Sequence, residues 1–376
     1  MLREVYINET NCITPIGFDV PTNIKNIGNE VSGIQWHNNN DLFQTPFYAS
    51  IINDDELNLA FGKVSISNEY SRLEKMMILA LEPIIKKTNF DLNHRTGFIL
   101  STTKGNVRAL ENLENIEAVY LNQLAKKIAD FFEFTAEPIV VSNACVSGIL
   151  AVSLAKRLIQ ANLYDNIFIV AGDEVSKFVL SGFNAFQAIS NQPCKPYSVN
   201  RTGVTLGEAA AAVLVSSNKA NAKIKIIGDG SINDANHISG PSRTGEGLFR
   251  SIQSALAEAK INSSQIDYIS AHGTATSFND EMEAIAFNRL GLENVPVNSF
   301  KGYYGHTLGA SGLLEAIIGI QSVEEGKLFA SLGFDTIGVS QPINVIEKNE
   351  DAVIRYFLKT ASGFGGSNTA VLFEKV

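Results

Sequence analysis

The sequence has few cysteines and no excess of basic residues. Only three cysteines occur among its 376 residues, Cys12, Cys145 and Cys194. They are too few and too scattered for a disulfide framework or a CxxC metal site, so we expect a reduced, cytoplasmic setting. The 30 basic residues are outnumbered by 39 acidic ones, which gives a formal charge of -9. This balance argues against a nucleic-acid binder that relies on overall basicity.

The sequence shows no long apolar run, and we expect no signal peptide. No stretch approaches the roughly 20 consecutive apolar residues of a membrane-spanning helix. The first residues include acids and lack the apolar core of a signal peptide. Hydrophobic residues nevertheless make up 45% of the chain and charged residues 18%. This composition excludes disorder, collagen and coiled coil, and predicts a protein outside the membrane with a sizeable core.

Short apolar runs alternate with helical stretches along the chain. Runs rich in Ile and Val occur at 97–103, 138–144, 166–173 and 210–217, and each is typical of a strand buried on both faces. The stretch 147–163 has helical spacing. Because such alternation is typical of βαβ units, the sequence predicts an α/β fold with a mostly parallel sheet.

The C-terminal part repeats this pattern. Residues 147–152 (SGILAV) match 311–316 (SGLLEA) at an offset of 164. Residues 212–215 match 370–373 at an offset of 158, and 97–100 match 267–270 more weakly at an offset of 170, so the three pairs occur in the same order in both parts. Three collinear matches favour an internal duplication over chance similarity among apolar strands. The predicted halves are 1–218 and 219–376.

Cys145 lies between a predicted buried strand and a long helix, in the segment VSNACVSG. A strand-to-helix turn would place its side chain near the helix N-terminus. The helix dipole and free N–H groups there favour a thiolate and can donate to an oxyanion. Cysteine is also commonly a small buried hydrophobe, and this segment alone supports the two interpretations equally.

Two of the five histidines lie in Gly- and Thr-rich segments beside predicted elements. His272 follows a predicted strand in SAHGTAT, and His306 precedes the second long helix in KGYYGHTLGA. In the duplicated frame Cys145 corresponds to Gly309, three residues beyond His306. Pseudo-symmetry would therefore bring Cys145 and His306 toward a shared centre. No histidine or carboxylate cluster has the spacing of metal ligands, so we predict no metal.

Four segments in this order resemble the β-ketoacyl-acyl-carrier-protein synthases, condensing enzymes of the thiolase superfamily. They are 143–148 (NACVSG), 271–276 (AHGTAT), 301–312 (KGYYGHTLGASG) and 363–368 (GFGGSN). The resemblance covers essentially the whole chain. It implies a thiolase-like fold, with two duplicated βαβ halves in α-β-α-β-α layers. The branch it resembles has a Cys-His-His triad, whereas initiating synthases have asparagine in place of His306.

The resemblance also implies what the residues at the centre of the site do. Cys145 would attack a thioester and hold the acyl chain. His272 and His306 would bind the malonyl thioester and stabilise the enolate formed when carbon dioxide leaves. Backbone N–H groups of Cys145 and Phe364 would form the oxyanion hole, and the Phe364 side chain would act as a gate.

Four more residues are assigned by the same resemblance. Lys301 would be the family's lysine, and Glu283 its counterpart in a buried ion pair that organises the site. Thr274 and Thr276 would bind the phosphopantetheine arm. No tightly bound cofactor is implied, because the substrates are carried on the phosphopantetheine of acyl carrier protein.

The implied reaction is a decarboxylative condensation that gives 3-oxoacyl-acyl-carrier protein in fatty-acid, polyene or polyketide-type biosynthesis. The implied partners are the carrier protein, docked at Arg72 and Lys75, and a second copy or a related synthase subunit, paired through the strand before Cys145. An equally supported interpretation is that Arg72 and Lys75 lie on a solvated helix face with no role in docking. The loop with Lys104 (STTKG) resembles synthases of aryl-polyene or flexirubin-type pigments. Alternatives are a chain-length-factor-like partner subunit and a coenzyme-A-dependent thiolase-type acyltransferase.

Overall fold

The computed structural model describes residues 2–67, 69–88, 90–112, 116–234 and 240–376. The main sheet has the strand order β13-β11-β10-β15-β16-β9-β1-β8-β6-β4-β5. Its N-terminal strands are β1 (Tyr6–Ile13), β4 (Thr96–Ser101), β5 (Ile139–Val141), β6 (Asn166–Asp173) and β8 (Ala209–Ser216). Its C-terminal strands are β9 (Ile224–Asn233), β10 (Tyr268–Ser270), β11 (Pro296–Asn298), β13 (Asn344–Val345), β15 (Tyr356–Gly363) and β16 (Ser367–Lys375).

The two parts of the sheet have the same topology. One part runs β5-β4-β6-β8-β1 and the other β11-β10-β15-β16-β9, and β1 pairs with β9 where they meet. Apart from β13, which extends the C-terminal part beyond β11, the order from the edge inward is the same in both parts: the third of the five strands in chain order, then the second, fourth, fifth and first. This repetition confirms the predicted duplicated fold. Where the halves divide, at 218/219, stays a prediction.

The sheet is mixed, so the prediction of a mostly parallel sheet was wrong. β4, β5 and β6 run parallel, but β8 is antiparallel to both β6 and β1. The C-terminal part repeats this, with β16 antiparallel to β15 and β9. Every residue of β8 is buried because helices cover both faces of the sheet. A strand that is buried on both faces has a continuous apolar run whether it is parallel or antiparallel to its neighbours. The sequence of β8 therefore did not reveal its direction.

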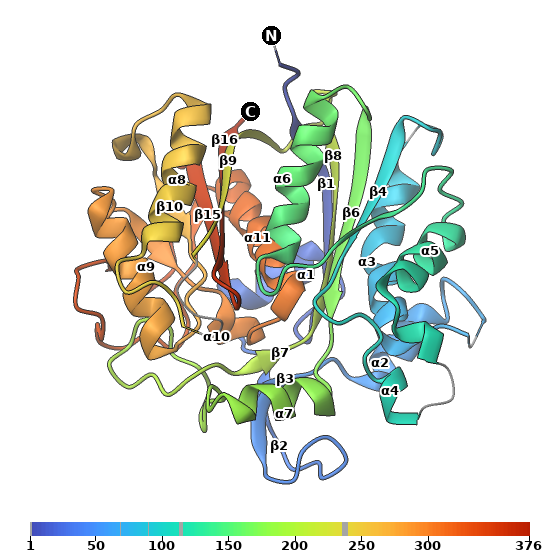
Figure 1. Cartoon of the computed structure of the whole chain (residues 1–376), viewed down its shortest axis with the longest axis horizontal. Coiled ribbons are helices and arrows are strands. Elements are labelled where there is room, and N and C mark those ends of the chain that lie inside the picture. The colour runs from blue at the N-terminus through green and yellow to red at the C-terminus, as the bar shows by residue number, and fades with distance from the viewer. Residues whose placement is uncertain (1, 68, 89, 113–115, 235–239) are drawn as a thin grey trace.

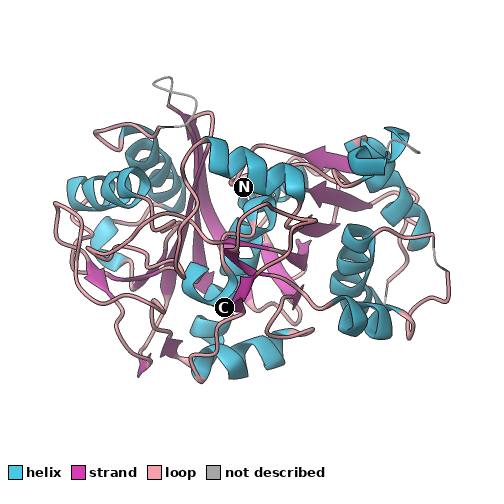
Figure 2. Cartoon of the chain, turned by 90° about the horizontal axis from the view of Figure 1, so that it is seen from below, coloured by secondary structure: helices cyan, strands magenta, loops and turns pink. Residues whose placement is uncertain are grey.

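Helices form three layers around the two parts of the sheet (Figures 1 and 2). One outer layer contains α3 (Arg72–Lys87) and α5 (Leu121–Phe131), and the other contains α8 (Glu246–Ala259) and α9 (Ser277–Arg289). α6 (Ser147–Gln160) and α11 (Ser311–Glu325) form the central layer. One apolar core joins both central helices to both parts of the sheet. The predicted α-β-α-β-α arrangement is confirmed.

Smaller elements complete the chain. They are α1 (Val20–Gly28), β2 (Ile34–His37), β3 (Phe47–Ser50), α2 (Asp54–Phe61), α4 (Ala109–Asn112), α7 (Lys177–Ala185), β7 (Leu206–Gly207), α10 (Lys301–Tyr304), β12 (Lys327–Leu328) and β14 (Glu350–Asp351). β2, β3 and β7 form a small separate sheet next to α7 (Figure 1). Within the described ranges, no helix combines the length and the apolar character needed to cross a bilayer.

The two central helices approach each other closely at their N-termini. A Cβ atom added to Gly148 would lie 2.7 Å from the Gly309 carbonyl oxygen, and one added to Gly312 would lie 3.0 Å from the Ile149 Cβ atom. Any side chain at Gly148 would therefore push the helices apart. The matching SG pairs at the starts of α6 and α11 thus bring together the two segments that precede them, which contain Cys145 and His306.

Candidate active site

Cys145 lies in the turn between β5 and α6. Ala144 has a φ of 44°, in the left-handed region that residues with a Cβ atom seldom adopt. The Ser147 hydroxyl stabilises this turn, since it accepts from the Asn143 N–H at 2.8 Å and donates to the Ala144 carbonyl at 2.6 Å. The sharp reversal directs Cys145 toward the cavity at the N-terminus of α6. Its side chain is 7% exposed.

Cys145, His272 and His306 come together in the fold. The sulfur and ring nitrogen atoms of the three side chains lie within 4.8 Å of one another. The two imidazole rings meet edge to face, with centroids 5.2 Å apart. Residues from the two halves thus converge at one point, as pseudo-symmetry predicted for Cys145 and His306. This spacing would also suit a soft metal ion, but the Lys301 ammonium, 3.4 Å from His272 Nδ1, opposes a cation there.

Burial keeps all three side chains uncharged at neutral pH. It raises the pKa of the Cys145 thiol to about 11, although Lys301, Lys104 and the Phe364 N–H act in the opposite direction. Burial, assisted by the Lys301 charge, lowers the pKa of His306 to about 3 and that of His272 well below its usual value. The histidines therefore rest as neutral imidazoles, each with one N–H to donate. Because Lys301 can only donate, His272 Nδ1 accepts and Nε2 bears the proton.

The predicted Lys301–Glu283 ion pair was wrong. Lys301 pairs instead with Glu315 of α11, with Nζ 2.7 Å from Oε1, and also donates to the His272 carbonyl. A second buried lysine, Lys359 of β15, lies 2.6 Å from Glu315 Oε2. Glu315 comes one helical turn after Ser311, whose hydroxyl also donates to it, so it faces the same interior as Lys301. The position of Glu283 eleven residues after His272 in the sequence did not reveal that Lys301 pairs with Glu315.

Glu283 supports the backbone of the His272 loop. Its carboxylate accepts from the His272 N–H at 2.8 Å and from the Gly273 N–H at 2.7 Å. One turn earlier on α9, Asp280 accepts from the Thr274 N–H at 3.0 Å. Two acids at i and i+3 on one helix face thus fix the loop that carries His272. The i, i+3 spacing of the two acids is visible in the sequence, but the backbone N–H groups that they bind are not.

A cavity of about 840 Å³ opens onto the triad. Thr274 and Thr276 line it, with their hydroxyl oxygens 2.8 Å apart. Phe364 also lines it, and its backbone lowers the pKa of the Cys145 thiol against the effect of burial. The Phe364 ring stacks on Phe183 with centroids 5.6 Å apart and is 36% exposed. The predicted oxyanion, phosphopantetheine and gate residues therefore share this one cavity.

Arg72 and Lys75 do not form the predicted docking pair. The Arg72 guanidinium lies among three carboxylates, those of Asp54, Glu174 and Glu208, and its side chain is only 11% exposed. Its charge is neutralised inside the protein, so the docking prediction for Arg72 was wrong. Lys75 is part-buried and donates to Asn58 Oδ1 at 2.8 Å. Its role in docking the carrier protein stays a prediction.

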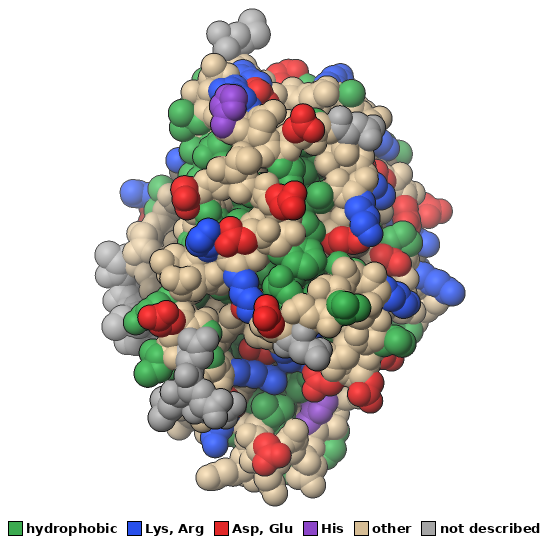
Figure 3. All heavy atoms as spheres, turned by 90° about the vertical axis from the view of Figure 1, so that its right-hand side faces the viewer, with side chains coloured by type: hydrophobic (Ala, Val, Ile, Leu, Met, Phe, Trp, Pro, Cys, Tyr) green, Lys and Arg blue, Asp and Glu red, His purple; other side chains and the backbone are tan. Residues whose placement is uncertain are grey.

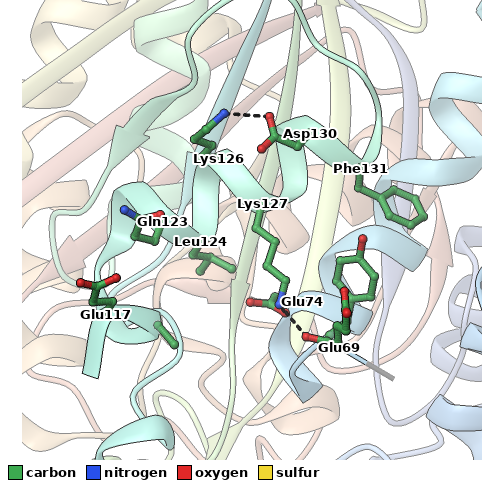
Figure 4. A pocket seen from close by; sticks show the side chains of 11 residues that line it. Glu69, Glu74, Glu117, Gln123, Leu124, Lys126, Lys127, Asp130 and Phe131 are labelled. Atoms are coloured by element: carbon green, nitrogen blue, oxygen red, sulfur yellow. Dashed lines mark hydrogen bonds and ion pairs between the residues drawn. The ribbon is translucent and has the colours of Figure 1, made fainter. Parts of the chain in front are cut away.

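A second hollow, of about 490 Å³, lies between α3 and α5 (Figure 4). Its two lysines are paired: Lys127 donates to Glu74 at 2.7 Å and to the Glu69 carbonyl at 2.6 Å, and Lys126 pairs with Asp130 at 3.0 Å. Four acidic side chains line it against these two basic ones. An acidic carrier protein would gain no attraction there.

Comparisons with known proteins agree with this geometry. Residues 5–221 match the model of the beta-ketoacyl synthase N-terminal domain, and residues 224–335 match that of the C-terminal domain. A 3-oxoacyl-[acyl-carrier-protein] synthase 2 of Staphylococcus aureus is 26% identical, with 99% of this chain and 98% of the relative covered.

Two solved structures share the fold. A ketosynthase in complex with its chain length factor from Xenorhabdus doucetiae has a TM-score of 0.86 at 24% identity, with 100% of this chain and 98% of that one covered. The ishigamide ketosynthase/chain length factor has a TM-score of 0.90 at 22% identity, with full coverage of both chains. The family models cover most of the sequence, and the chain belongs to the β-ketoacyl synthase family of condensing enzymes.

Proposed function

We propose that the chain condenses malonyl-acyl-carrier protein with an acyl group held on Cys145, and releases carbon dioxide and a 3-oxoacyl-acyl-carrier protein. The observation that carries the proposal is the convergence of Cys145, His272 and His306 within 4.8 Å at the base of one cavity. A chain-length-factor-like role would not need this complete nucleophilic site.

In the first half-reaction Cys145 takes the acyl group. Its sulfur attacks the thioester carbonyl, the new C–S bond forms, and the bond to the phosphopantetheine sulfur breaks. The Cys145 proton leaves with the phosphopantetheine thiol, so charge balances. The developing oxyanion is stabilised by the N–H groups of Cys145 and Phe364. The Phe364 backbone already lowers the pKa of the Cys145 thiol, which places it near the sulfur.

In the second half-reaction the histidines act on the malonyl thioester. The bond to the carboxylate breaks, carbon dioxide leaves, and the electron pair moves onto the thioester oxygen. Neutral His272 and His306 donate N–H to this enolate, a role that an already charged imidazolium pair so close together could not fill without repulsion. The carbanion then attacks the acyl-Cys145 carbonyl, a C–C bond forms, and the Cys145 sulfur departs as a thiolate that takes one proton from solvent to return to the resting thiol.

Intact-mass spectrometry tests the assignment. Incubation with acyl-acyl-carrier protein is expected to add one acyl mass to the chain, and Cys145→Ala is expected to abolish it. Cys12→Ala is the matched control, because Cys12 is also a buried free cysteine but lies in β1. An acyl adduct that survives Cys145→Ala would refute the proposal.

The acyl carrier protein and a second synthase-type subunit are the proposed partners. Arg243 lines the cavity and is exposed, so it and Lys75 are the residues we expect to attract an acidic carrier protein. Arg243→Glu should raise the apparent KM for the carrier protein and leave kcat unchanged. Lys260→Glu, at the far end of α8, is the control, and equal KM values in both variants would exclude Arg243.

The subunit contact is proposed at β5. This strand is at the edge of the sheet, and Ile139 and Val140 are only half-buried, so its backbone can pair with another sheet. On the side of the molecule that carries α4 and α5, hydrophobic side chains gather between acidic and basic ones (Figure 3). Sedimentation equilibrium should find a dimer, either of this chain or with a co-expressed related subunit. A monomer in both cases would contradict this contact.

The acyl chain is proposed to be polar, aryl or conjugated. Lys104 affects the Cys145 thiol through its charge, and its Nζ lies 6.0 Å from the Phe178 ring centroid. A lysine beside an acyl chain disfavours saturated carbon and can interact with an aromatic or conjugated system. Acyl transfer to Cys145 should be faster from aryl or polyenoyl than from long saturated carrier-protein substrates. The reverse preference would contradict this assignment.

A further inference from the structure

Asp173, at the C-terminal end of β6, is a buried carboxylate that the reaction above does not use. It is 2% exposed. Its oxygens accept from the Thr102 hydroxyl at 2.9 Å, from the Thr103 hydroxyl at 2.9 Å and N–H at 2.9 Å, and from the Gly309 N–H at 2.8 Å. We call these four residues the Asp173 cluster. A carboxylate only accepts, and here donors surround it on every bonded side.

The Asp173 cluster joins two segments that border the triad. Thr102 and Thr103 begin the loop after β4 that carries Lys104, and Gly309 follows His306 in the turn into α11. A Cβ atom at Gly309 would lie 2.6 Å from Asp173 Oδ2 and 3.0 Å from the Thr103 nitrogen. The two segments therefore pack directly on each other, with the carboxylate as their shared acceptor.

We propose that Asp173 is a positioning residue that couples the Lys104 loop on the acyl side to the His306 turn on the malonyl side. The inference rests on the proposed roles of Cys145 and His306. Asp173 fixes both segments through backbone and hydroxyl donors from opposite halves of the fold. Its place in the reaction is indirect, since it acts through Thr103 on one side and through Gly309 on the other.

The cluster also contributes to the charge around Cys145. The groups that face the sulfur are Lys301, Lys104, His272, His306 and Asp173. The Asp173 charge raises the pKa of the Cys145 thiol, against the effect of the two lysines. Loss of this charge should therefore make the thiol easier to ionise, while loss of a loop hydrogen bond with the charge retained should not.

Two variants separate the two sides of the cluster. Asp173→Asn keeps the shape but turns one acceptor into a donor, so it weakens both contacts. Thr103→Val removes one hydroxyl bond and leaves the charge and the Gly309 contact. Asp173→Asn should lower both acyl transfer to Cys145 and malonyl decarboxylation by about tenfold or more, the loss expected for hydrogen bonds to a charged group. Thr103→Val should slow acyl transfer only, and Thr103→Ser should restore it.

Alkylation of Cys145 by iodoacetamide, followed against pH, is the second measurement. Its profile should move to lower pH in Asp173→Asn and stay in place in Thr103→Val. Unchanged acyl transfer in Thr103→Val, or an unmoved profile in Asp173→Asn, would overturn the inference. If Asp173→Asn does not fold, the rate of acyl transfer in Thr103→Val alone decides whether the inference holds. The alkylation profile tests the effect of Asp173 on the thiol even if the chain transfers no acyl group. Failure of this inference can therefore be distinguished from failure of the proposed function.

Discussion

Replacement of Glu315 by glutamine should destabilise the fold more than loss of any exposed ion pair. The carboxylate is buried and pairs with two buried ammonium groups, Lys301 at 2.7 Å and Lys359 at 2.6 Å. Burial alone would raise the pKa of Glu315, but the two lysines outweigh it and lower the pKa. The carboxylate is therefore charged in the folded protein at neutral pH.

Glu315→Gln would leave two buried positive charges without a carboxylate. Removal of one partner of a buried pair typically costs about 3–5 kcal/mol. Lys359 would retain the carbonyl oxygens of Ser270, Ala271 and Thr360 as acceptors, which limits the loss to about this range. The free energy of unfolding in urea measures it, because urea, unlike guanidinium chloride, does not screen charges.

A double-mutant cycle with Lys359→Met isolates the charge term. Lys359→Met removes one of the two stranded ammonium groups, so the double variant should be more stable than the sum of the two single losses predicts. A coupling of about 1–3 kcal/mol is expected for groups in direct contact. A loss below about 1 kcal/mol in Glu315→Gln, or strict additivity in the cycle, would refute the reasoning.

Three further predictions follow from the site. Malonyl decarboxylation by Cys145→Gln should not change between about pH 5.5 and 8, because the pKa of His306 is lowered to about 3; an acid limb near the ordinary histidine value of about 6.5 would contradict neutral donors. Arg72→Met should cost about 3–5 kcal/mol in urea unfolding and leave the KM for carrier protein within about twofold, whereas a docking residue would show the opposite. Lys104→Leu should increase acyl transfer from long saturated substrates relative to aryl ones, and an unchanged ratio would exclude Lys104 from chain selection.

The sequence predicted the architecture well because the duplication leaves a periodic trace. The SG pairs that start α6 and α11 recur at an offset of 164, close to the offsets of the other two matches, and each is needed where the two helices meet. Cys145 and His306 could be placed near each other on that basis. His272 was added to them by the resemblance of the AHGTAT segment to a known family, because a histidine at a Gly/Thr-rich strand end is weak evidence when taken alone.

Charge pairing could not be predicted in the same way. The sequence-based prediction pairs Lys301 with Glu283 and places Arg72 on a docking surface, yet Lys301 contacts Glu315 and Arg72 contacts Glu174 and Glu208. An ion pair depends on side-chain directions from elements far apart in the chain, and these do not follow from composition or spacing. Lys359 lies within the apolar run of β15, which indicates that it is buried and needs an acidic partner. The sequence does not show that this partner is Glu315.

The sequence by itself determined the α/β class and the duplication, and its motifs pointed to Cys145, His272 and His306 as the site. Each of these depends on local patterns: burial on strands, helical spacing and motif residues next to an element end. The tertiary structure alone decided strand direction, the acids that neutralise Lys301, Lys359 and Arg72, and the place of Asp173 between two loops. These depend on which surfaces pack together, because in a low-dielectric interior every buried charge must find its partner across the fold.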